Sequence, residues 1–116
     1  MANITQREVF IMEYRRFGNT IYLRLDPKEE ILEEIGKVAK KKNIRLAQVT
    51  GLGAINDFTA GVYNTVTKEY HSIQFQGAFE IVSLTGTVTR KDGDVYLHLH
   101  IAAGDEEGHV HGGHLN

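Results

Sequence analysis

The feature that most constrains the fold is a series of strand-like segments, several of them joined by tight turns. Residues 79–89 form a long β-type run, and residues 94–102 alternate from side to side as a half-buried strand does. Between them, Asp92-Gly93 favours the tight turn of a hairpin. The other predicted strands are residues 7–14, 21–25, 44–50, 58–63 and 70–75. The expected sheet therefore has about seven strands and is mainly antiparallel.

One segment departs from this pattern and predicts a helix. In Asp26-Pro27-Lys28-Glu29, the aspartate can cap the helix, the proline suits its first position, and the glutamate completes a capping box. Apolar residues then recur at helical spacing, at positions 31, 32, 35, 38 and 39, and Asn43 can end the helix. We therefore expect the α+β class, with one main amphipathic helix packed on one face of the sheet.

The overall composition limits the classes of function. A chain of 116 residues predicts a single domain, residues 1–116, and a net charge of −2 offers no global basic field for a phosphate backbone. The absence of cysteine excludes disulfides and thiolate sites. No apolar run approaches the roughly 20 residues of a membrane-spanning helix, and the first residues lack a signal-peptide pattern. A cytoplasmic protein is expected.

Histidine is concentrated at the end of the chain. Five of the six histidines lie at positions 98, 100, 109, 111 and 114. His98 and His100 are two apart in a strand and should share a face. His114 follows Gly112-Gly113, where the chain can turn sharply and bring a third imidazole back to the pair. Three imidazoles with one open position are typical of catalytic zinc, and imidazole also suits iron, nickel and copper.

Spacing leaves alternatives to this interpretation. His109 and His111 could be ligands instead, or the histidines could be exposed polar residues with a fortuitous affinity for metals. No catalytic base is evident. The carboxylate candidates are Glu80, Glu106 and Glu107, and the last two are more typical of a solvated loop.

Four segments together resemble a known family. They are Gly51-Leu-Gly-Ala54, residues 79–86, Leu97-His-Leu-His100 and Gly112-Gly-His-Leu115. They look like the PPC, or "plants and prokaryotes conserved", domain, which implies an α+β subunit that forms a homotrimer. The fold and the His-x-His…Gly-Gly-His pattern are also similar to those of acetolactate decarboxylase, a zinc enzyme. The pattern implies that His98, His100 and His114 are the metal ligands, and it gives no ligand role to positions 109 and 111.

This chain departs from the family in two respects. Family members usually continue for a further strand or two after Gly-Gly-His-Leu, whereas this sequence stops at Asn116. Either the sequence is incomplete or the sheet lacks an edge strand. Plant members bind DNA through an AT-hook containing Arg-Gly-Arg-Pro, which is absent here.

Two functional expectations follow from the residues and the resemblance. The first is a stand-alone PPC-domain protein, trimeric and zinc-binding, whose open three-histidine site binds or acts on a small oxygenated molecule. Whether it is an enzyme is not decided by the sequence. The alternative is a DNA-associated regulatory or protein-assembly module without catalysis.

Overall fold

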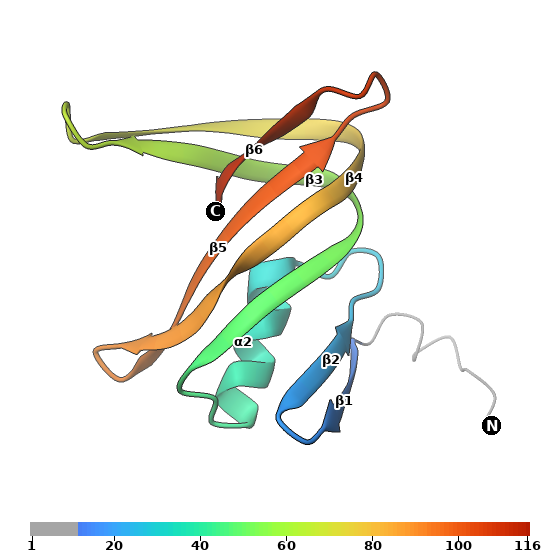
Figure 1. The fold of residues 1–116 in the computed structure, drawn as a ribbon, viewed down its shortest axis with the longest axis vertical. Coiled ribbons are helices and arrows are strands. Elements are labelled where there is room, and N and C mark those ends of the chain that lie inside the picture. Colours follow the sequence, from blue (N-terminus) through green and yellow to red (C-terminus); the bar gives the residue numbers. More distant parts are fainter. Residues whose placement is uncertain (1–11) are drawn as a thin grey trace.

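A computed structural model describes residues 12–116 and confirms the α+β class, with six strands and one helix in that range (Figure 1). The strand pairs are all antiparallel. In chain order the elements are β1 (Glu13–Phe17), β2 (Thr20–Arg24), α2 (Ile31–Lys41), β3 (Ala47–Asn64), β4 (Glu69–Lys91), β5 (Asp94–Gly104) and β6 (Val110–Leu115).

The first hairpin forms a separate two-stranded sheet. β1 pairs with β2 from Glu13 opposite Arg24 to Phe17 opposite Thr20, which confirms the reversal expected at residues 18–19. β1 continues to Phe17, although a turn was expected from residue 15, because the reversal needs only the two residues between the strands. Residues 7–11 of the predicted first strand lie outside the described residues.

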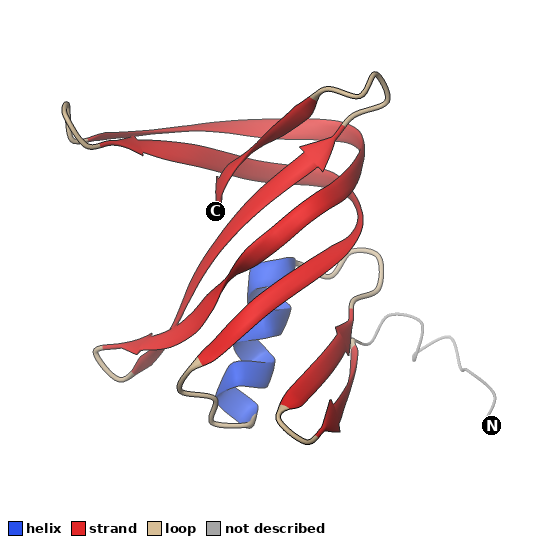
Figure 2. Ribbon diagram, in the orientation of Figure 1, coloured by secondary structure: helices blue, strands red, loops and turns tan. Residues whose placement is uncertain are grey.

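The other four strands form a sheet in the order β3-β4-β5-β6. The sheet is closed, because β6 also pairs with β3. β3 and β4 are single long strands of 18 and 23 residues, where two separate strands each were expected. Bulges between Gly51 and Gly53 and between Ile55 and Asp57 absorb the irregular residues without ending the pairing. The outer end of this hairpin, residues 62–71, lies beyond the part of β3 that pairs with β6 and includes the turn that projects from the body of the molecule (Figure 2). We call this end the arm.

The helix start expected at residues 26–29 is wrong. α2 begins at Ile31, and the carboxylate of its N-cap, Glu30, accepts hydrogen bonds from the backbone N–H groups of Leu32 and Glu33. Lys28 has a φ of 76°, a left-handed conformation that a helix cannot include. The expected capping-box hydrogen bond still forms, because the Glu29 carboxylate accepts from the backbone N–H of Asp26 at 2.6 Å. It closes a separate turn before the helix.

The predicted end and packing of the helix are confirmed. Asn43 has a φ of 53°, as a left-handed stop requires. Ile31, Leu32 and Ile35 pack against the hydrophobic core, so α2 lies against one face of the sheet (Figure 1). No helix in residues 12–116 is long and apolar enough to cross a membrane.

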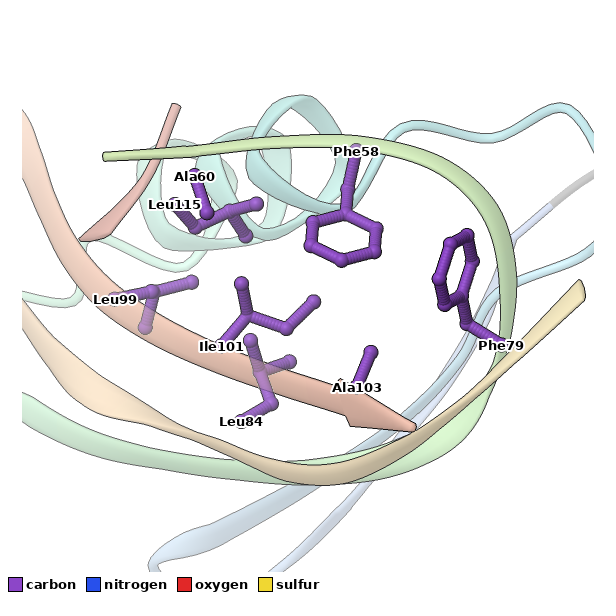
Figure 3. Close-up of a cluster of buried hydrophobic side chains, with 8 residues drawn as sticks. All are labelled: Phe58, Ala60, Phe79, Leu84, Leu99, Ile101, Ala103 and Leu115. Atoms are coloured by element: carbon purple, nitrogen blue, oxygen red, sulfur yellow. The ribbon is translucent and has the colours of Figure 1, made fainter. Parts of the chain in front are cut away.

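The core fills the space enclosed by the four strands β3 to β6. Its largest fully buried side chain is Leu99, which is 0% exposed. Phe58 stacks on Phe75 and meets Phe79 edge-on. Figure 3 shows the cluster, which comprises Phe58, Ala60, Phe79, Leu84, Leu99, Ile101, Ala103 and Leu115. Because strand residues alternate, burial of Leu99 and Ile101 turns His98 and His100 to the opposite face.

Candidate metal centre

Three histidines converge on the outer face of β5 and β6. His98 and His100 are exposed on β5, and His114 on β6 stands directly opposite His100 in the strand register. The ring centroids of His98 lie 5.1 Å from those of both His100 and His114. One nitrogen from each ring can be chosen so that all three lie within 4.8 Å of one another. These are the three residues that the sequence pattern predicted as ligands.

His114 reaches the pair by strand pairing, so the sharp turn expected at Gly112-Gly113 is wrong. The reversal lies earlier, between β5 and β6, and both glycines lie within β6, where Gly113 has a φ of 153°. A Cβ on Gly112 would lie 2.1 Å from the carbonyl oxygen of Ile101, and one on Gly113 would lie 2.6 Å from that of Gly61. The glycines are therefore needed for close approach of β6 to both of its neighbours.

His109 and His111, the other two histidines of this region, contact Asp105 and not the three-histidine cluster. His111 Nε2 lies 3.0 Å from the Asp105 carboxylate, and its ring packs on Phe75. The backbone N–H of His109 donates to the same aspartate. Hydrogen bonding to His111 is the main cause that lowers the pKa of Asp105. The structure thus brings neither residue into the three-histidine cluster, and Asp105 shapes the turn that leads into β6.

An open pocket of about 490 Å³ lies beside the cluster. One wall comes from the arm, which contributes side chains that the sequence pattern did not single out. The carboxylate candidates Glu80, Glu106 and Glu107 do not line this pocket, and neither does any other Asp, Glu, Lys or Arg side chain of the described residues. The lining residues are Gly61, Val62, Tyr63, Tyr70, His98, His100, Gly113 and His114.

The protonation of His114 provides a test of this geometry. Burial lowers its pKa below the ordinary value of 6.5, and positive charge on His98 and His100 lowers it further. On acidification through pH 6.5, the unfolded chain takes up a proton at this position before the folded chain does. The free energy of unfolding therefore falls as the pH is lowered from 6.5, and it stops falling once the pH is below the lowered pKa of His114. An NMR titration of the metal-free protein should place the His114 midpoint below 6.5, and a midpoint at or above 6.5 would contradict this placement.

The donor set fits a transition metal such as zinc. Imidazole nitrogens bind zinc at about 2.0–2.1 Å, so tetrahedral ligands lie about 3.3 Å apart. A spread of 4.8 Å is within reach of small side-chain rotations, because two of the three rings are exposed. Three neutral ligands would leave a divalent ion with its full charge and a free coordination position.

Comparisons with known proteins agree with this architecture. The model of the Plants and Prokaryotes Conserved (PCC) domain matches residues 12–116. A candidate DNA-binding protein from Bacteroides thetaiotaomicron superposes with a TM-score of 0.87 and 32% identity, over 90% of this chain and 73% of that one. A plant- and prokaryote-conserved protein from Pyrococcus horikoshii gives a TM-score of 0.76 and 35% identity, over 90% and 71% of the two chains.

A third solved structure bears on the histidine cluster. It is described as a metal-containing protein from Archaeoglobus fulgidus, and it superposes with a TM-score of 0.72 and 27% identity. The superposition covers 91% of this chain and 68% of that one. No protein of curated function matches the chain.

Proposed function

Because the chain belongs to the Plants and Prokaryotes Conserved (PCC) domain family, we propose that it is a metal-binding member of that family, with zinc held by His98, His100 and His114. The observation that carries this proposal is the convergence of three imidazoles beside an open pocket. The metal-containing protein from Archaeoglobus fulgidus supports it. In this proposal the site binds or acts on a small oxygenated molecule in the cytoplasm.

The pocket explains why an oxygen ligand suits this site. A bound zinc ion supplies a Lewis acid that polarises a coordinated oxygen. Among the described residues the pocket lining carries no carboxylate, so the charge of the ion would not be neutralised by the residues around it. The side chains of Val62 and Tyr63 give an apolar wall, against which the carbon skeleton of a small molecule can pack. Ligand recognition would therefore depend on the metal and on a few polar groups.

The experiment that tests the proposal measures metal content directly. Untagged protein purified without nickel should contain close to one zinc or similar ion per chain by elemental analysis. If the ion is lost during purification, the protein should take up zinc when offered and retain it through dialysis. Protein that retains no metal after this treatment would overturn the proposal.

We also propose that the chain assembles with copies of itself, as a homotrimer. Large apolar side chains are exposed on the outer surface, among them Leu52 at 88% and Val82 at 61%, which flank the same bulge between β3 and β4. Such side chains are expected to be covered in an assembly. Light scattering coupled to size-exclusion chromatography should give three times the chain mass, whereas a monomeric mass would contradict the assembly.

A DNA-associated or protein-assembly role without catalysis is the alternative function. It is favoured by the description of the Bacteroides thetaiotaomicron protein as a candidate DNA-binding protein. The net charge of −2 gives it no electrostatic support. Binding to duplex DNA that weakens steeply between about 50 and 200 mM salt would favour this alternative.

A further inference from the structure

Tyr70 stands beside the three-histidine cluster with its hydroxyl group already engaged. It lies on the arm directly opposite Tyr63, and it lines the same pocket as the three histidines. Its ring meets that of His114 edge-on, with 6.1 Å between the centroids. Its hydroxyl donates a hydrogen bond to the side-chain oxygen of Asn116, at 2.6 Å.

The position of this hydroxyl is fixed by a glycine. A Cβ on Gly61 would lie 2.3 Å from the Tyr70 hydroxyl oxygen, so only a residue without a side chain lets the phenol lie across β3. Gly61 is in turn the register partner of His114. The Tyr70 hydroxyl therefore lies over Gly61, the residue of β3 that pairs with His114.

This hydrogen bond determines what the hydroxyl can offer to the pocket. A tyrosine hydroxyl has one proton to donate and two lone pairs that accept. The proton is used by Asn116, so towards the pocket the oxygen can only accept a hydrogen bond. A ligand with a hydroxyl group at this position would be matched, whereas a ligand with a carbonyl oxygen would place lone pairs against lone pairs.

We propose that Tyr70 is a specificity-determining residue that makes the site prefer a small α-hydroxy acid to the corresponding α-keto acid. This inference rests on the proposed metal site, which would hold the carboxylate. The ligand hydroxyl donates to the Tyr70 oxygen, and the apolar wall formed by Val62 accommodates a small substituent. One neutral hydrogen bond gives a preference of about three- to tenfold.

The test compares two acids that differ only in this group. Protein loaded with cobalt(II) is titrated with L-lactate and with pyruvate, and binding is followed by the visible absorption of the metal. The wild-type protein should bind lactate about three- to tenfold more tightly than pyruvate. Tyr70→Phe should remove this preference by weakening lactate, with unchanged cobalt content.

Two further variants separate the role of Tyr70 from general effects. Tyr96→Phe is the matched control, because the ring centroid of Tyr96 lies 6.4 Å from that of His98 but Tyr96 does not line the pocket. This variant should keep the preference for lactate. Asn116→Ala frees the Tyr70 proton, so the hydroxyl can donate to a carbonyl. In that variant the preference should shrink because pyruvate binds more tightly.

The outcomes distinguish this inference from the proposal beneath it. Equal affinity for the two acids in the wild-type protein, or an unchanged preference in Tyr70→Phe, would overturn the role of Tyr70. The metal site itself would stand in that case, provided that the absorption spectrum shows bound cobalt. Protein that binds no cobalt would overturn the metal site and the inference together.

Discussion

Replacing His98 and His100 together with alanine should abolish stoichiometric zinc binding. The two residues supply two of the three imidazoles in the cluster, and a single remaining ligand cannot hold the ion. We expect the zinc affinity to fall by about three orders of magnitude or more. Both side chains are exposed, so the fold should survive the change. Isothermal titration with zinc and elemental analysis of dialysed protein measure the loss, and circular dichroism checks the fold.

The matched control removes two histidines from outside the cluster. His71 and His109 are both exposed, and neither lies among the three converging rings. The His71→Ala/His109→Ala variant should therefore bind zinc as the wild-type protein does. If the two double variants retain the same amount of zinc, the cluster does not hold the metal.

The largest effect on stability is expected from Gly86→Ala. Gly86 lies on β4 opposite Leu99, and an added Cβ would stand 1.9 Å from the carbonyl oxygen of His98 and 2.7 Å from the Cα of Leu99. Both contacts are with backbone atoms, which cannot move without disturbing the pairing of β4 and β5. We expect the free energy of unfolding to fall by about 3 kcal/mol or more, as measured by urea denaturation.

Gly104→Ala provides the corresponding control on β5. The nearest atoms to a Cβ at this position are 4.0 Å away, so the substitution should change stability by less than about 1 kcal/mol. Failure of Gly86→Ala to accumulate as folded protein, while Gly104→Ala does, would agree with the expectation. A Gly86→Ala variant within about 1 kcal/mol of the wild type would contradict it.

The sequence predicted element types better than element boundaries. Helical spacing identified α2 and its left-handed end at Asn43 correctly, because those signals act within a few residues. The break expected around residues 76–78 does not end β4, although Gly77 has a φ of 146°. A glycine can mark either a strand end or an irregularity within a strand. Only pairing with β3, far away in the sequence, decides between the two.

In the candidate metal centre, too, local signals were read correctly and long-range strand pairing was not. Two-residue alternation placed His98 and His100 on one face, and the structure agrees. His111 is excluded by alternation within β6, because residues 111 and 114 are three apart and face opposite sides, and His111 pairs with the buried Ala103. This result was missed because a sharp turn, not a strand, was expected at residues 112–113. Tyr70 was missed because the long β3–β4 register that carries it beside His114 has no local signal.

β6 is both the strand that closes the sheet and the carrier of the third imidazole. A metal that bridges β5 and β6 would stabilise the closed sheet by mass action, with a free energy that grows as the logarithm of the free metal concentration once this exceeds the Kd. By thermodynamic reciprocity, any change that loosens the pairing of β6 would weaken metal affinity by the same factor, even if it touches no histidine. The fraction of molecules in which β6 is paired would thus depend on the free metal concentration around the protein.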